Sequence, residues 1–191
     1  MSYIIGLDPG KKQDPAALAT IHAFPNERAM HIVDLVRFPV GTAYTDLTST
    51  VIAYARHEKL KAPVLVVDVG GVGEAVRDVV SKELETVVGV MSTSGFEDYF
   101  DHNTWTWYLP KTTLVENLER GIRGGGLKAA PTLALLPMLV EELTAFRRII
   151  TKAGHTTYSH RTKDSHGDLA IAAAMAYSYA RMVGKRAQSA S

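Results

Sequence analysis

The sequence contains no cysteine. Disulfide bonds, thiolate catalysis and zinc sites with cysteine ligands are therefore excluded, and a reducing compartment such as the cytoplasm is expected. No signal peptide is expected either, because the first residues, MSYIIGLDPG, have neither a basic start nor a long apolar core. The longest apolar stretch, PTLALLPMLVEELTAF, is interrupted by Pro137 and two glutamates, so we predict no membrane-spanning segment.

The sequence also has no large excess of positive or negative charge. Lysine and arginine number 21 against 20 aspartates and glutamates, which gives a net charge of +1. Overall charge therefore does not predict nucleic-acid binding, and any basic surface must be local. The 191 residues suffice for one domain with a substantial core. We expect a single domain over residues 3–183, a disordered tail over 184–191, and a monomer.

Short apolar runs alternate with segments of helical periodicity. Buried strands are predicted at 3–7, 64–67 and 86–91, and helices at 45–60 and 73–84. Two extended runs, 16–24 and 29–38, predict an antiparallel hairpin near the start. This order is typical of an α/β fold with a mixed central sheet whose later strands are parallel and whose faces are covered by helices.

The second half reads as more helical. Helices are predicted at 111–122 and 132–146, with a loop and short strand at 124–130 between them. The polar, basic segment 147–164 predicts a surface hairpin, and the alanine-rich segment 165–183 a last helix. The aromatic residues Trp105, Trp107 and Tyr108 could stack on bases, but a hydrophobic strand that packs on the core is the preferred interpretation.

Three aspartates stand at the ends of predicted elements. Asp8 ends the first strand, Asp68 ends a later central strand, and Asp168 lies in the first turn of the last helix. Carboxyl ends of parallel strands share one edge of a sheet, where ligands bind in open α/β folds. Carboxylates packed there repel one another, and Mg²⁺ or Mn²⁺ ions with oxygen ligands relieve the repulsion. Two such ions about 4 Å apart support phosphodiester hydrolysis.

Each aspartate also has a simpler explanation. DPG, around Asp8, is a common turn, and DVGGVG, around Asp68, is a plausible strand end. Asp168 could form a capping box with Ser165 or favour the helix dipole. Asp14, in QDPAA, is the weakest candidate and is better explained as a turn residue. The metal-site hypothesis depends on the three strand-end and helix-start aspartates occurring together.

Five segments, in this order, resemble the nuclease domain of phage terminase large subunits. The resemblance covers Tyr3 to about Met182 and implies an RNase H-like fold, related to the RuvC-type resolvases. The segments that carry it are IIGLDPGKKQDPAALATI, VLVVDVGGVGEAVRDVV, LPKTTLVENLERGIRGGGLKA, LVEELTAFRR and SHGDLAIAAAMAYSYA.

The resemblance implies a metal-dependent endonuclease that cuts concatemeric viral DNA during genome packaging, in the host cytoplasm if phage-encoded. Its cofactor would be Mg²⁺ or Mn²⁺, with two ions, and its substrate double-stranded DNA. A packaging ATPase, a small terminase or a portal protein would be its partners. The family's acidic positions fall on Asp8, Asp14, Asp68 and Asp168.

The last motif departs from the family pattern. The family often has His-Asp-Asp-Leu where this sequence has HGDL, so Gly167 replaces the first aspartate and removes one possible ligand. His166 could contact a phosphate or a water near the site, although a lone histidine at a helix start is more often a surface residue.

DNA binding requires phosphate neutralisation by clustered cations. Such cations follow the first aspartate, flank a glycine loop and precede the last helix, and they predict phosphate contacts with little sequence preference. For any one of them, a solvated surface position is the simpler explanation. The candidate DNA-binding residues are Lys11, Lys12, Arg120, Arg123, Arg161 and Lys163.

Alternative functions remain open. A RuvC-like junction resolvase shares the chemistry, but would dimerise and prefer four-way DNA. A catalytically weak DNA-binding module on the same fold is supported by Gly167. A nucleotide-binding fold of the actin and sugar-kinase type would need a second domain. No G-x-x-x-x-G-K-[ST] motif for a packaging ATPase is present, so the chain is an excised domain or an autonomous protein, and Met1 close to the first strand favours the latter.

Overall fold

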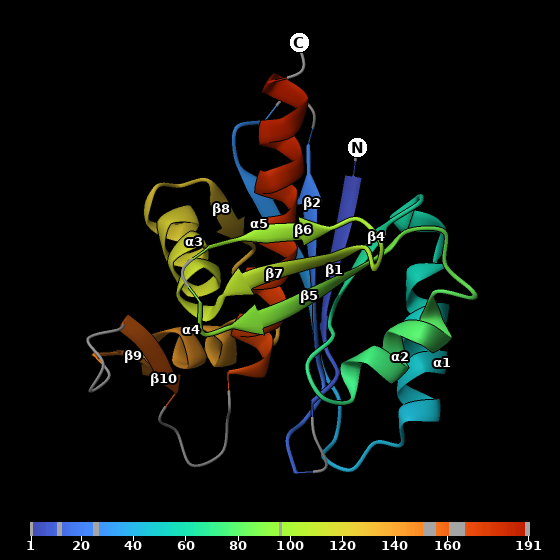
Figure 1. Cartoon of the computed structure of the whole chain (residues 1–191). Coiled ribbons are helices and arrows are strands. Elements are labelled where there is room, and N and C mark those ends of the chain that lie inside the picture. The colour runs from blue at the N-terminus through green and yellow to red at the C-terminus, as the bar shows by residue number, and fades with distance from the viewer. Residues whose placement is uncertain are drawn as a thin grey trace.

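An eight-stranded mixed sheet forms the centre of the computed structural model, which describes residues 2–10, 13–24, 27–95, 97–150, 156–160 and 167–189 (Figure 1). Its strands are β1 (Ser2–Asp8), β2 (Ala17–Ala23), β3 (Met30–Arg37), β4 (Val64–Asp68), β5 (Val87–Thr93), β6 (Tyr99–Asp101), β7 (Thr106–Pro110) and β8 (Leu127–Ala129). They lie in the order β6-β7-β5-β4-β1-β2-β3-β8. Strands β9 (Phe146–Ile150) and β10 (Thr156–His160) form a separate antiparallel hairpin.

Helices cover both faces of the sheet. On one face lie α1 (Tyr44–Ala55) and α2 (Gly73–Val80), with the short 3-10 helix η1 (Glu58–Leu60) following α1. The other face carries α3 (Lys111–Arg123), α4 (Leu136–Ala145) and α5 (Asp168–Ser189). Each face has its own hydrophobic core. Within the described part of the chain, no helix is long and apolar enough to span a bilayer.

The pairing of the strands confirms the predicted α/β class with a mixed central sheet. β1 and β2 run antiparallel, as do β2 and β3, which is the predicted hairpin. The neighbours β1 and β4, β4 and β5, and β5 and β7 are parallel. The carboxyl ends of β1, β4, β5 and β7 therefore meet at one edge of the sheet.

Three details differ from the sequence-based expectation. Helix α4 begins at Leu136, because Pro137 is best tolerated in a first turn. Helix α5 continues to Ser189 into the expected tail, where most residues are good helix formers. Trp107 is buried in the core as predicted, but Trp105 precedes β7 in a turn and is 59% exposed, so its assignment to the core was wrong.

Helix α5 packs directly on β1 and β2. Its first half carries buried small side chains at Ala170, Ala172, Ala173, Ala174 and Ala176. The contact is closest at Gly6, where an added Cβ atom would lie 1.9 Å from the backbone oxygen of Ala172. Only glycine leaves room for the helix backbone at this position. The register of α5 over the sheet, and with it the position of Asp168, is therefore fixed at Gly6.

We predict that Gly6→Ala destabilises the protein by about 1–3 kcal/mol, because its methyl group displaces the α5 backbone. In an open strand the same change would be neutral or favourable. Gly95→Ala is the control, since its Cβ would meet only the Thr93 hydroxyl, at 3.7 Å. Urea unfolding of both variants measures the difference. Equal stability of Gly6→Ala and the native protein would contradict the proposed close contact.

Candidate metal and catalytic site

Two aspartates end neighbouring parallel strands in the same local arrangement. The backbone N–H of Gly10 donates to Asp8 Oδ1 at 3.0 Å, and that of Gly70 donates to Asp68 Oδ1 at 2.8 Å. In both cases the amide lies two residues after the carboxylate, so the D-x-G sequence forms a turn that fixes the aspartate side chain. Gly10 adopts a φ of +65°, a conformation that favours glycine.

A cavity of about 300 Å³ lies at this edge of the sheet. All four aspartates that the sequence singled out line it, as do the loops after β1 and β4, the end of β5 and the first residue of α3. The structure thus brings together residues that are up to 160 positions apart in the chain. The lining residues are Asp8, Pro9, Gly10, Asp14, Asp68, Gly70, Ser92, Lys111, Asp168 and Ile171.

Asp168 reaches the cavity as the first residue of α5 and is only 4% exposed. The preceding Gly167 has a φ of +84°, and its carbonyl accepts the N–H of Ile171 at 2.8 Å. A side chain at Gly167 would be strained in this conformation. The glycine that replaces the family's first aspartate therefore has a backbone role, as the residue from which the helix begins.

Asp14 lies nearer the site than its turn sequence suggested. It is half-buried and lines the cavity. A Cβ atom on Gly10 would lie 2.6 Å from the backbone oxygen of Asp14, so the loop folds back tightly on itself. Asp14 is near enough for its charge to raise the pKa of Asp8.

The cavity concentrates negative charge. Burial, together with the charges of Asp68, Asp168 and Asp14, raises the pKa of Asp8 from its ordinary value of 3.8 to about 8, although the hydrogen bond from the Gly10 N–H lowers it. The four carboxylates therefore repel one another when all are ionised. A cation in the cavity would relieve this repulsion.

The donor set fits a hard divalent cation. Carboxylate oxygens are the ligands that Mg²⁺ and Mn²⁺ prefer, and the cavity supplies four such groups. In the conformation described, no three carboxylate or imidazole groups among the described residues converge closely enough to form a ready-made metal site. The side chains instead surround the cavity.

Lys111 is a site residue that the sequence analysis did not identify. It is the first residue of α3, directly after the end of β7, and it lines the same cavity as the aspartates. No ion pair holds it among the described residues. Lys111 follows a predicted strand, and Asp8 and Asp68 likewise stand at strand ends. Its place in the site depends on β7 lying beside β5, which the sequence analysis did not predict. Ser92, near the end of β5, also lines the cavity and was also missed.

Glu142 was also missed, although it supports the site. It lies on α4, is fully buried, and its Oε2 accepts the backbone N–H of Ala170 at 2.9 Å. A carboxylate here satisfies an N–H group of the first turn of α5 and favours the positive end of the helix dipole. Glu142 therefore anchors the turn that carries Asp168.

The candidate DNA-binding residues are only partly described. Arg120 and Arg123 lie in the last turn of α3, roughly 14 Å or more along the helix from Lys111, and neither lines the cavity. Arg123 Nε pairs with Glu119 at 2.9 Å, and Arg120 lies 4.0 Å from Glu116. The other candidates lie outside the described residues, namely Lys11, Lys12, Arg161, Lys163 and the near-site His166.

No protein-family model and no curated protein sequence matches the chain. Solved structures do. The large terminase nuclease of the thermophilic phage G20c, with bound magnesium, is 21% identical, with a TM-score of 0.67 over 93% of this chain and 80% of that chain. This chain has the fold of a large-terminase nuclease domain. The expected RNase H-like fold is thereby confirmed.

Two further structures with the terminase nuclease fold come from more distant viruses. The nuclease domain of the bacteriophage SPP1 large terminase, with bound Mn, is 15% identical, with a TM-score of 0.58 over 94% of this chain and 87% of that chain. The human cytomegalovirus terminase nuclease domain is 19% identical, with a TM-score of 0.56 over 93% and 82%. The phage G20c nuclease is also solved with bound cobalt.

We predict that the Asp8 carboxylate makes the stability of the protein depend on pH when divalent ions are removed. Its folded-state pKa of about 8 exceeds its ordinary value of 3.8, so folding favours the protonated form. The contribution of protonated Asp8 to the free energy of unfolding is fully present below about pH 4 and is lost as the pH rises towards 8. Melting temperatures in EDTA should fall over this range for the native protein, and fall less for Asp8→Asn.

Divalent ions provide the matched test. At a pH of about 8, Mg²⁺ or Mn²⁺ should raise the melting temperature of the native protein, because ligands that bind the folded state stabilise it. The same ions should have little effect on Asp8→Asn. Identical pH and metal responses in the two proteins would show that Asp8 is not part of a charged metal site.

Proposed function

We propose that this protein is a metal-dependent DNA endonuclease of the terminase type, which hydrolyses phosphodiester bonds with two divalent ions. The observation that carries the proposal is the meeting of Asp8, Asp68 and Asp168, from β1, β4 and α5, around one cavity. The terminase nuclease fold supports it, as do the magnesium, cobalt and Mn bound to similar nucleases. By the same proposal, the DNA cut is concatemeric viral DNA during genome packaging.

Asp8, Asp68 and Asp168 are the proposed metal ligands, with Asp14 as a weaker one. When bound, Mg²⁺ or Mn²⁺ would lower the pKa of a water, so that the water loses its proton readily and can attack phosphorus. The ions would also supply positive charge that stabilises the leaving oxygen. The carboxylates hold ions and take no covalent part. The N–H groups of Gly10 and Gly70 hold two of these carboxylates in place before any ligand arrives.

Lys111 is the proposed contact to the scissile phosphate. Lys111 lines the same cavity as the four aspartates, so its positive charge would be available to a phosphate bound there. A fixed positive charge at this point stabilises the additional negative charge of the pentavalent transition state. Lys111 also offsets part of the repulsion between the carboxylates and the DNA backbone.

Double-stranded DNA is the proposed substrate, with contacts mainly to phosphates. The basic residues after Asp8 and before α5 flank the site in sequence, and we propose them as the backbone contacts. A packaging ATPase, small terminase or portal protein would bring the DNA to the site. The cleavage would then have little sequence preference of its own.

We predict that the protein nicks and linearises supercoiled plasmid with Mg²⁺ or Mn²⁺ but not with EDTA. Asp68→Asn should abolish this cleavage and leave folding intact, because asparagine keeps the oxygen that accepts the Gly70 N–H but loses the charge. The control is Asp78→Asn, an exposed position on α2. Cleavage by Asp68→Asn at the native rate would refute the site, and resolution of four-way junctions in preference to plasmid would favour the resolvase alternative.

Lys111 gives a separate prediction. Lys111→Ala should lower kcat by about 10²-fold, the usual loss on removal of one transition-state stabilising group, while metal-induced stabilisation persists. Lys111→Arg should retain more activity than the alanine variant, since it keeps the charge. Single-turnover cleavage at saturating DNA measures the rate of the chemical step, on which the lysine would act, and steady-state cleavage measures kcat. Unchanged kcat with weaker DNA binding would assign Lys111 to binding only.

A further inference from the structure

A second cavity, of about 380 Å³, adjoins the cavity that the four aspartates line. Pro9 and Asp14 line both, so the two lie side by side at the edge of the sheet where β1 and β3 end. We call the second cavity the Tyr44 pocket. Its lining residues are Pro9, Asp14, Ala16, Pro39, Gly41, Thr42, Ala43, Tyr44 and Val72.

The walls of the Tyr44 pocket are mostly apolar. Proline, alanine and valine side chains supply aliphatic surface, and Tyr44, the first residue of α1, supplies an aromatic ring and is 39% exposed. The hydroxyl of Thr42 donates to the Pro39 carbonyl at 2.7 Å, within the loop itself. Asp14 contributes a carboxylate, and within the described part of the chain no lysine or arginine lines the pocket. Such walls suit an uncharged ring and not a phosphate.

Backbone contacts hold the walls in place. The N–H of Phe38 donates to the Ala16 carbonyl at 2.9 Å, which joins the chain after β3 to the loop that follows β1. A Cβ atom on Gly73 would lie 1.7 Å from the backbone oxygen of Asp68, so α2 begins in direct contact with the end of β4. The pocket is therefore bounded by segments that are tied to the sheet.

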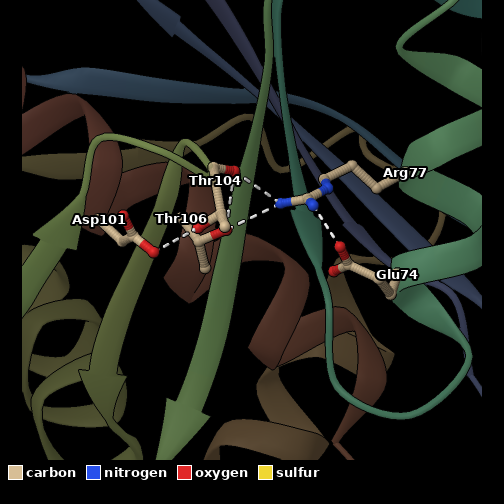
Figure 2. Close-up of polar contacts among 5 residues, drawn as sticks. All are labelled: Glu74, Arg77, Asp101, Thr104 and Thr106. Atoms are coloured by element: carbon tan, nitrogen blue, oxygen red, sulfur yellow. Dashed lines mark hydrogen bonds and ion pairs between the residues drawn. The ribbon is translucent and has the colours of Figure 1, made fainter.

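Arg77 fixes the position of α2 from the other side (Figure 2). Its Nη1 donates to the Thr104 carbonyl at 2.9 Å and to Thr106 Oγ1 at 2.8 Å, and its Nη2 pairs with Glu74. These bonds tie α2 to β7 and the turn before it. Val72, the residue directly before α2, is thereby held as one wall of the Tyr44 pocket.

We propose that the Tyr44 pocket receives one base of the DNA, from the nucleotide next to the phosphate held at the four aspartates. The inference rests on the proposed nuclease function. Because the two cavities share Pro9 and Asp14, a strand whose phosphate lies in the first brings its adjoining base to the second. The base leaves the helical stack and lies against Tyr44 and the aliphatic walls.

The pocket selects for an unpaired base and not for one of the four bases. Rotating a base out of a duplex costs free energy, and the cost is smallest where the base is already unpaired. Stacking on an aromatic ring is available to every base, since each has a π-face. An apolar side chain of a partner protein would also suit such walls. The shared lining favours the base, because DNA bound at the aspartates already brings one to this point.

The test measures binding and does not depend on cleavage. Fluorescence anisotropy compares three labelled duplexes in Ca²⁺, an ion that binds carboxylate oxygens. One duplex is fully paired, one has a single unpaired adenosine, and one has an abasic nucleotide in its place. The native protein should bind the duplex with the unpaired base at least about fivefold more tightly than the abasic duplex, the effect of one base stacked on an aromatic ring.

Variants locate the contact. Tyr44→Ala should bind the duplex with the unpaired base as weakly as the abasic duplex, and its affinity for the abasic duplex should equal that of the native protein. Alanine is a good helix former, so α1 should be retained. Tyr44→Phe keeps the ring and should keep the preference. Val40→Ala is the control, since Val40 is 60% exposed in the same loop and does not line the pocket.

Two outcomes would overturn the proposal. Equal binding of the base-bearing and abasic duplexes by the native protein would leave the pocket to a protein side chain. An equal loss of affinity for both duplexes in Tyr44→Ala would show that the tyrosine contacts the DNA backbone. Plasmid cleavage without any preference for the unpaired base would refute the pocket alone. A preference for that base in a protein that cuts no plasmid with any ion would refute the nuclease function alone.

Discussion

The contact between the backbone of α5 and β1 determines where the candidate site can form. Gly6 has no side chain, and the alanines of α5 are small, so the helix lies directly on the sheet. Helix α5 begins directly after Gly167, and Glu142 fixes its first turn through the Ala170 N–H. Together these contacts place the first residue of the helix above two strand ends that would otherwise carry isolated carboxylates. Packing in the core thus sets the geometry of the polar edge.

That edge carries an electrostatic cost which the fold alone does not remove. Four aspartates line one cavity, and burial together with their mutual repulsion raises the pKa of Asp8. Lys111 lines the same cavity, and we propose that it supplies one compensating charge. Native proteins tolerate such arrangements mainly at functional sites, where a ligand supplies the missing charge. The carboxylates, the lysine and the terminase nuclease fold therefore lead to the same proposed chemistry.

The sequence predicted the parts of the site that follow from local pattern. Asp8 and Asp68 end apolar runs, and the alternation of strands and helices places such ends at one edge of a sheet. Lys111 was not predictable in this way, since its position depends on β7 pairing with β5, a contact between distant segments. Glu142 was not predictable either, because the group it binds, the Ala170 N–H, belongs to a different helix further along the chain. Trp105 was misassigned because an aromatic run cannot show which residue belongs to the turn before the strand.

The most direct test of the central claim is the anomalous scattering of manganese in crystals soaked with Mn²⁺. The account predicts a peak inside the cavity, within coordination distance of carboxylate oxygens of Asp8, Asp68 and Asp168, that is lost in Asp68→Asn crystals. Peaks only elsewhere on the molecule, or an equal peak in the variant, would contradict the account, because these aspartates would then not be the metal ligands.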